Sequence, residues 1–183
     1  MKWTIFLSAC CLLLLGLNVA LVWQNRSLKA QLSQSPLGTE ASPGAHVSDL
    51  RGFDVQGKPV SITYQGDTRK VLLFVFSPTC SFCAENWPNW WHIFSELDRN
   101  TVQPAAVDVT ATVTPEFINQ HQMTGMPVLA QVDPKAVVEY HFHLTPQTIL
   151  VGADGKVEKV WSGVLSAANL AEIQTLIRHP VFK

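Results

Sequence analysis

One short segment limits what this chain can fold into more than any other: an apolar run followed almost at once by two cysteines. Residues 71–76 read Val-Leu-Leu-Phe-Val-Phe, and a Ser-Pro-Thr turn separates them from Cys80 and Cys83. A continuous run of β-forming apolar residues predicts a strand buried on both faces, as in a sheet covered by helices. Residues 81–97 predict a helix that Pro88 should kink. The cysteine pair is therefore expected where a central strand passes into a helix.

This setting favours a redox-active dithiol. A helix N-terminus presents unpaired N–H groups and about half a positive charge, which stabilises a thiolate. We therefore predict that Cys80 is the nucleophile, with a pKa below ~8.5. Cys83 lies one helical turn further on, from where it can resolve a mixed disulfide formed on Cys80.

The cysteine count supports the same interpretation. The other two cysteines, Cys10 and Cys11, lie in an apolar N-terminal run, so Cys80 and Cys83 are the thiols available to the rest of the chain. Two cysteines are too few for a structural disulfide framework or a closed zinc site. We predict no bound metal and no cofactor other than the Cys80–Cys83 redox disulfide itself.

The N-terminal segment predicts a membrane anchor. Residues 3–23 are apolar except for Thr4, Ser8 and Asn18. About 20 residues at ~1.5 Å per residue span a hydrocarbon core ~30 Å thick. We interpret residues 1–24 as an uncleaved signal-anchor transmembrane helix. A cleaved signal peptide and a lipoprotein processing box at Cys10 are the alternatives.

The remaining residues predict a flexible linker and one domain. Residues 25–45 are rich in Ser, Gln, Ala, Pro and Gly and are interpreted as the linker, and residues 46–183 as the domain. The net charge of −1, with acids and bases mixed, gives no reason to expect a nucleic-acid partner.

The order of strand-like and helix-like segments along the domain predicts an α/β fold with a central mixed sheet flanked by helices. Its expected elements, besides the strand and helix above, are a hairpin at 50–62, strands at 102–109, 128–132, 148–151 and 157–161, and helices near 115, at 134–140 and at 166–178.

Several motifs together resemble one superfamily. The Cys-x-x-Cys after a buried strand, Pro88 five residues beyond Cys83, Thr145-Pro146 before a strand and an Asp-Gly-Lys turn at 154–156 occur in the order that thioredoxins have. Over about residues 47–177 the chain resembles the thioredoxin superfamily. It is most similar to the membrane-tethered TlpA/ResA-like branch, which includes periplasmic reductases serving cytochrome c maturation. The resemblance implies a thioredoxin-like fold with a cis Thr145–Pro146 bond beside the dithiol, where Thr145 and Pro146 would bind an extended substrate segment.

The resemblance also implies a function. It suggests a protein-disulfide oxidoreductase that reduces disulfides of extracytoplasmic protein partners and draws electrons from an upstream membrane thiol reductant. Its setting would be cytochrome c biogenesis or the maturation of another enzyme. The opposite reaction, donation of a disulfide, uses the same residues. Lys and Arg near the anchor slightly favour a cytoplasmic domain, but the signal-anchor layout and the resemblance favour a single-pass inner-membrane protein whose domain faces the periplasm.

Three positions depart from the family pattern. Thr79 stands where the family often has Trp. Asn86 stands where the branch often has a Glu thought to tune the dithiol, and Glu85 lies one residue earlier, rotated by ~100° on a helix. The Ser81-Phe82 dipeptide between the cysteines contains neither Pro nor His. Since the intervening residues help to set thiolate stability, the sequence leaves the redox potential open.

Two other functions remain as alternatives. His141 and His143 precede the Thr145-Pro146 dipeptide, and one of them with both cysteines would form a copper-type site for metal delivery. The other alternative is a thiol peroxidase with Cys80 as nucleophile. Of the remaining residues, Asp108 is interpreted as a cap or turn residue rather than a proton carrier. Three tryptophans on the active-site helix are interpreted as packing: Trp87, Trp90 and Trp91.

Overall fold

The structure, a computed structural model, describes residues 3, 6, 15–24, 26, 41–64 and 66–178. The chain divides into two compact units, Met1–Thr39 and Glu40–Lys183. Residues 15–24 of the first unit are helical. In the ranges just given, no helix combines the length and apolarity needed to cross a membrane. The rest of the predicted signal-anchor and most of the predicted linker lie outside the described residues.

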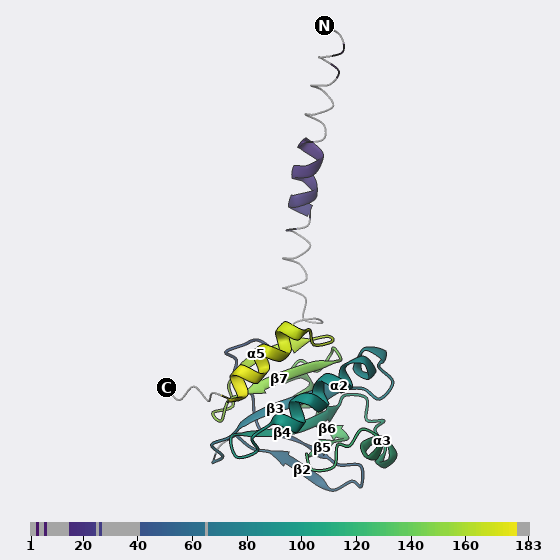
Figure 1. The fold of residues 1–183 in the computed structure, drawn as a ribbon, viewed down its shortest axis with the longest axis vertical. Coiled ribbons are helices and arrows are strands. Elements are labelled where there is room, and N and C mark those ends of the chain that lie inside the picture. The colour runs from purple at the N-terminus through teal and green to yellow at the C-terminus, as the bar shows by residue number, and fades with distance from the viewer. Residues whose placement is uncertain are drawn as a thin grey trace. The chain divides into compact units, whose positions relative to one another are not determined.

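The second unit contains the elements expected of an α/β domain (Figure 1). Its strands are β1 (Leu50–Phe53), β2 (Pro59–Ile62), β3 (Lys70–Phe76), β4 (Val102–Asp108), β5 (Val128–Leu129), β6 (Gln131–Val132), β7 (Gln147–Val151) and β8 (Val157–Ser162). Its helices are α2 (Ser81–Glu96), α3 (Pro115–Gln120), α4 (Pro134–Glu139) and α5 (Ala167–Arg178).

A five-stranded sheet forms the centre of the domain, in the order β5-β4-β3-β7-β8. β4 pairs parallel with both β3 and β5, whereas β7 pairs antiparallel with β3 and β8. The predicted mixed sheet is therefore confirmed. The parallel β3–β4 pair ends with Phe76 beside Asp108, so the loops that follow these two strands leave from the same edge.

A second, three-stranded sheet has the order β2-β1-β6. The predicted hairpin at 50–62 is confirmed, but the single strand predicted over residues 128–132 is wrong. The segment forms two short strands, β5 in the large sheet and β6 in the small one. Ala130 lies between them and donates its N–H to the carbonyl of Phe53 at 2.8 Å, so the chain changes sheets at that residue.

Both faces of the large sheet are covered. From Val71 onward every residue of β3 is buried. Successive side chains of a strand point to opposite faces, so Leu72, Phe74 and Phe76 join one core cluster and the residues between them join another. Helices α2 and α5 lie side by side over the first face (Figure 1). This burial explains the uninterrupted apolar run in the sequence.

The ordered domain begins earlier than the predicted boundary at residue 46. Ala41 is buried, and the N–H of Gly44 donates to the carbonyl of Val157 at 2.7 Å. The N–H of Val157 in turn donates to the carbonyl of Ala45 at 2.9 Å. Residues assigned to the linker by composition are thus paired with the first residue of β8.

Candidate active site

The two cysteines lie where β3 passes into α2. Cys80 is the N-cap of α2, with φ −84° and ψ 117°, and its sulfur accepts the N–H of Cys83 at 3.2 Å. An N-cap side chain that accepts this bond satisfies one of the unpaired donors of the first helical turn. The N–H of Cys80 itself donates to the carbonyl of Ser77 at 3.1 Å. The predicted strand-to-helix position of the dithiol is confirmed.

The two sulfurs have opposite environments. Both thiols are free; Cys80 is partly exposed, whereas Cys83 is 1% exposed. Burial raises the pKa of Cys83 to about 12, and the hydrogen bond with Cys80 adds to this effect. Burial would also raise the pKa of Cys80, but hydrogen bonds from the side chains of Cys83 and Thr145 and from nearby backbone lower it below its ordinary value. Cys80 is therefore the thiol that ionises first.

The Thr145–Pro146 bond is cis, as the resemblance implied. The carbonyl of Thr145 lies 3.6 Å from the sulfur of Cys80, and the Thr145 side chain lowers the pKa of both cysteines. The fold thus brings Thr145 to the dithiol across 65 residues of sequence. The roles of Cys80 and Cys83 in catalysis, and of Thr145 and Pro146 in substrate binding, stay predictions.

A third segment, the loop at residues 163–165, also reaches this region, and sequence reasoning missed it. The N–H of Gly163 donates to the carbonyl of Pro146 at 2.8 Å. The N–H of Leu165 donates to Oδ1 of Asn86 at 2.9 Å, and Nδ2 of Asn89 donates to the carbonyl of Leu165 at 3.1 Å. Asn86, which replaces the expected Glu, is fully buried and joins α2 to this loop. Nothing in the local sequence indicates a bond between residues 79 positions apart.

Asp108 occupies the end of β4 and is 1% exposed. Its carboxylate accepts hydrogen bonds from the loop that follows, at residues 110–113. The interpretation of Asp108 as a turn residue is confirmed.

The chain is similar to proteins whose names describe thiol–disulfide enzymes or thioredoxins. No family model matches the chain. The protein named sporulation thiol-disulfide oxidoreductase A, from Bacillus subtilis (strain 168), is 23% identical over 123 residues, which cover 64% of this chain and 73% of the relative. A solved structure from Chlorobium tepidum, described as a DsbE thiol:disulfide interchange protein, matches with a TM-score of 0.61 and 20% identity over 76% of this chain and 98% of that one. The exposed lipoprotein thioredoxin Etrx1 of Streptococcus pneumoniae strain TIGR4 matches with a TM-score of 0.50 and 22% identity over 70% and 99%.

The chain has a thioredoxin-like fold. The predicted fold is confirmed by the solved structures, and the predicted resemblance to thiol–disulfide oxidoreductases is confirmed by the sequence match. The predicted enzyme class, a protein-disulfide oxidoreductase, agrees with the names of these relatives.

The two histidines singled out in the sequence lie close together in this thioredoxin-like protein, with ring centroids 6.3 Å apart. His143 is exposed, and His141 adopts a positive φ of 53°. Within the described part of the chain, no three His, Cys, Asp or Glu side chains are grouped so that they could hold a metal ion. The geometry of these residues therefore gives no support to the copper-type alternative.

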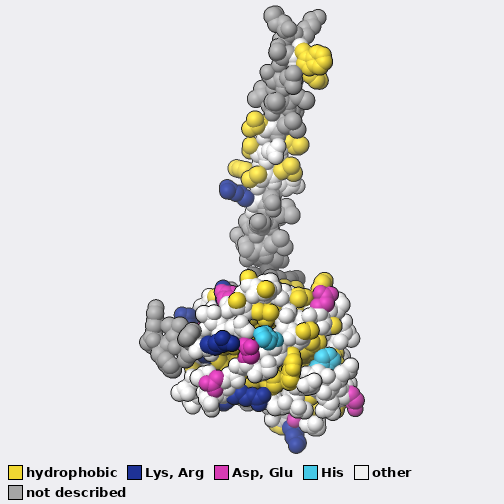
Figure 2. All heavy atoms as spheres, in the orientation of Figure 1, with side chains coloured by type: hydrophobic (Ala, Val, Ile, Leu, Met, Phe, Trp, Pro, Cys, Tyr) yellow, Lys and Arg dark blue, Asp and Glu magenta, His cyan; other side chains and the backbone are white. Residues whose placement is uncertain are grey.

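The tryptophans of α2 pack mainly within the thioredoxin-like domain. Trp90 is 1% exposed and its Nε1 donates to Oγ1 of Thr148 at 2.8 Å. Trp87 is half-buried, and its ring contacts Phe76 edge-on at 5.4 Å between centroids. Trp91 is 40% exposed. Figure 2 shows hydrophobic side chains at the surface of the face that α2 covers. The interpretation as packing residues is confirmed for Trp90 and Trp87.

Proposed function

We propose that this protein is a thiol–disulfide oxidoreductase that reduces disulfides of protein partners outside the cytoplasm. The observation that carries the proposal is the asymmetry of the dithiol. One sulfur is accessible and readily ionised, and the other is buried one helical turn away and stays protonated. A nucleophilic thiol must be ionised to attack, and a resolving thiol must wait until the first has reacted.

The reaction proceeds in two exchanges. The Cys80 thiolate attacks one sulfur of a partner disulfide, so a Cys80–partner disulfide forms and the partner's other sulfur leaves as a thiolate. Cys83 then loses its proton to solvent and attacks the sulfur of Cys80. The second partner thiolate leaves, and the Cys80–Cys83 disulfide remains. Two electrons have passed to the partner, so a membrane thiol reductant must restore the dithiol before the next cycle.

Trapping the first exchange tests the function and identifies partners. Because the resolving thiol is missing, the Cys83→Ser protein should accumulate a mixed disulfide with its partners. A small dithiol reductant should cleave this complex. Cys80→Ser should form no such complex, since it lacks the nucleophile. Equal trapping by the two variants, or none by Cys83→Ser, would contradict the proposed roles.

The reducing direction is tested by the reduction potential. Reductants such as thioredoxin have potentials near about −270 mV, and strong disulfide donors lie near about −120 mV. We expect equilibration with a glutathione or thioredoxin couple to place this dithiol nearer the first value. A value near the second would show that the protein donates disulfides instead.

The proposed location is the inner membrane, with a single pass and the domain facing the periplasm. The apolar run at residues 3–23 supports it. In cells that express the full chain, the protein should remain in the membrane fraction after alkaline extraction, and Cys80 should react with a membrane-impermeant thiol reagent. Release into the soluble fraction would argue against the anchor. Labelling only after lysis would show that the domain faces the cytoplasm.

A role in cytochrome c maturation would be supported if an apocytochrome c were among the partners trapped by Cys83→Ser.

A further inference from the structure

Two asparagines of α2 hold the 163–165 loop by its backbone. Oδ1 of Asn86 accepts the N–H of Leu165 at 2.9 Å. Nδ2 of Asn89 donates to the carbonyl of Leu165 at 3.1 Å and to Oδ1 of Asn86, also at 3.1 Å. Side chains three positions apart on a helix are neighbours, so the two amides can act on one residue of the loop. Both backbone polar groups of Leu165 are thereby bound to side chains of α2.

The chemistry of these bonds is specific to asparagine. A backbone N–H needs an acceptor and a backbone carbonyl needs a donor, so the oxygen of Asn86 and the nitrogen of Asn89 must face Leu165. An amide oxygen has two lone pairs and an amide nitrogen has two hydrogens. These numbers match the two bonds that Asn86 Oδ1 accepts and the two that Asn89 Nδ2 donates. We call this pair of side chains the asparagine clamp.

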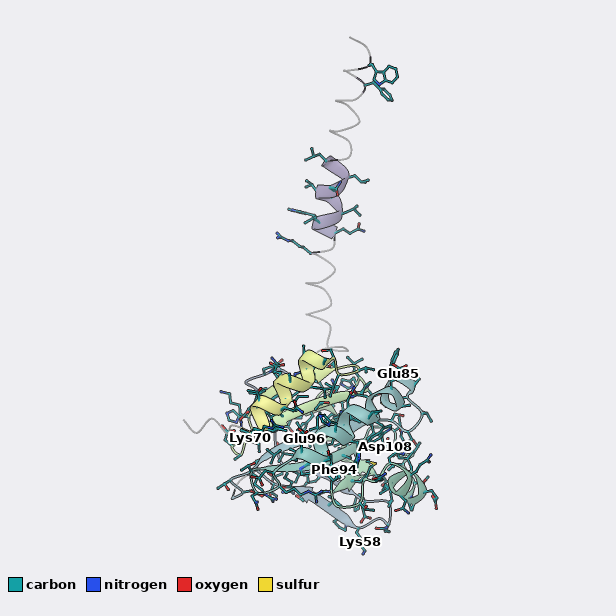
Figure 3. The ribbon with its side chains drawn as sticks, viewed as in Figure 1. Lys58, Lys70, Glu85, Phe94, Glu96 and Asp108 are labelled. Atoms are coloured by element: carbon teal, nitrogen blue, oxygen red, sulfur yellow. The ribbon has the colours of Figure 1, made fainter. Side chains whose placement is uncertain are left out.

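The asparagine clamp lies in the half of α2 that carries the dithiol. Asn86 directly follows Glu85, which Figure 3 shows toward one end of α2, with Glu96 toward the other. The opposite end of the loop is bound to the cis-proline segment, because the N–H of Gly163 donates to the carbonyl of Pro146 at 2.8 Å. The loop is therefore fixed at both of its ends beside the dithiol.

The residue between these two attachment points faces outward. Val164 is 37% exposed, whereas Leu165 is 4% exposed. Two more exposed apolar side chains lie next to residues of the site: Leu144 precedes Thr145, and Phe82 lies between the two cysteines. Exposed apolar side chains that gather in one place mark a surface for an apolar partner. A partner that brings its disulfide to the dithiol would meet this surface.

We propose that Asn86 and Asn89 are positioning residues that hold the 163–165 loop in place, so that Val164 contacts an apolar side chain next to the partner's disulfide. The partner that fits is an extended protein segment with an aliphatic or aromatic residue beside its disulfide cysteine. This inference rests on the proposed dithiol function.

The inference demands a loss of partner preference without a loss of sulfur reactivity. An extended segment docks against several groups, and a loop that must first be ordered makes that docking weaker. A small disulfide needs only the sulfur. Cys80 keeps the N–H of Cys83 and its contact with Thr145 when the asparagine clamp is removed, so its reactivity should not change.

Activated disulfides with a common leaving group separate docking from chemistry. Two short peptides, one with leucine and one with serine beside its single cysteine, and mercaptoethanol are each joined through sulfur to the same coloured aromatic thiol. The Cys80 thiolate of the Cys83→Ser protein attacks the aliphatic sulfur, a new disulfide forms, and the aromatic thiolate leaves because its thiol has the lower pKa. In stopped flow we expect the leucine peptide to react about 4- to 15-fold faster than the serine peptide, the rate equivalent of burying one or two methyl groups.

Variants made in the Cys83→Ser protein test the contact and the clamp separately. Val164→Ser removes the contact, whereas Asn86→Leu and Asn89→Ala remove the asparagine clamp. Each should bring the two peptide rates to within about twofold of each other and leave the rate with the mercaptoethanol derivative within about twofold of the parent's. Tyr64→Phe removes a buried hydrogen bond on the other face of the sheet and should keep the parent's preference. Asn89 is only half-buried, so its variant tests the inference if Asn86→Leu does not fold.

The outcomes distinguish this inference from the function on which it rests. If Cys80 of the parent released the aromatic thiolate no faster than glutathione does at neutral pH, the dithiol function itself would be refuted. With a reactive Cys80, equal rates for the two peptides would overturn the inference alone. So would a preference that survives both asparagine substitutions, an equal loss of preference in Tyr64→Phe, or an equal fall in the rate with the mercaptoethanol derivative.

Discussion

At the residue scale, two chemically identical side chains three positions apart differ because of where the helix begins. Cys80 lies outside the first turn and accepts a backbone N–H, which favours negative charge on its sulfur. Cys83 lies inside the turn and faces the core, which disfavours charge. Each sulfur is thereby suited to one of the two exchanges.

Thr145→Val should raise the pKa of Cys80, because the side chain of Thr145 is among the groups that lower it. A thiol with a lowered pKa stays reactive as the pH falls until the pH passes that pKa. The pH midpoint of alkylation of the reduced wild type should therefore lie below that of an ordinary thiol, and the midpoint of Thr145→Val should lie higher. Thr145→Ser, which keeps the hydroxyl, is the control. If both variants had the wild-type midpoint, the side chain of Thr145 would have no part in activating the thiol.

At the element scale, α2 is attached to the central sheet by a buried polar bond as well as by apolar packing. Nε1 of Trp90 donates to Oγ1 of Thr148 in β7. The same strand directly follows the cis Thr145–Pro146 bond. The bond therefore ties the helix that carries the dithiol to the strand that starts beside it.

Thr148→Val should reduce the free energy of unfolding by about 1–3 kcal/mol, because the indole N–H of Trp90 would stay buried without an acceptor. Thr148→Ser keeps an acceptor oxygen and should lose less. Urea unfolding followed by tryptophan fluorescence would measure both values. Equal losses in the two variants would assign the effect to altered packing around residue 148 rather than to the hydrogen bond.

At the scale of the whole molecule, a second polar bond joins segments far apart in the chain on the other face of the sheet. The hydroxyls of Tyr64 and Tyr140 lie 2.6 Å apart, and the hydroxyl of Tyr140 donates to the carbonyl of Ser48 at 2.5 Å. Both rings are at least 98% buried. These bonds hold the first residues of the domain against the end of α4.

Tyr140→Phe should therefore destabilise the protein more than Tyr64→Phe. The first change removes the partner of both Tyr64 and the Ser48 carbonyl, whereas the second leaves the Tyr140–Ser48 bond intact. We expect a loss of about 1–3 kcal/mol for Tyr140→Phe and a smaller one for Tyr64→Phe, measured by denaturant unfolding. The reverse order would show that the bond to Ser48 contributes little.

The raised pKa of Cys83 makes the stability of the reduced protein depend on pH. In the unfolded chain a cysteine ionises near about pH 8.5, whereas folded Cys83 keeps its proton until about pH 12. Between these values the folded state binds more protons, so the free energy of unfolding falls as pH rises, by up to about 1.4 kcal/mol per pH unit. The contribution is fully present below about pH 8.5.

Urea unfolding of the reduced wild type and of Cys83→Ser at several pH values from about 8 to about 10 would test this dependence. The stability difference between the two proteins should shrink steadily over that range, because serine does not ionise there. A constant difference would mean that Cys83 ionises equally easily in both states.

Much of the fold could be predicted because its signals are local. The apolar run of β3, the Pro near the start of α3 and the turn before β8 each depend on residues close together in sequence. The division of residues 128–132 between two sheets could not be predicted, since it depends on a bond from Ala130 to Phe53. The burial of Ala41 was missed for the same reason: composition says nothing about which strand a polar segment will meet.

By itself, the sequence determined that a dithiol lies where a buried strand turns into a helix, because strand burial, helix initiation and a Cys-x-x-Cys spacing are all short-range properties. Only the tertiary structure decided how the two sulfurs differ in acidity. Thr145 and the core residues that bury Cys83 come from separate strands, helices and loops. Their positions follow from packing of the whole domain, and hydrogen bonds and burial act over only a few ångströms in space, whatever the separation along the chain.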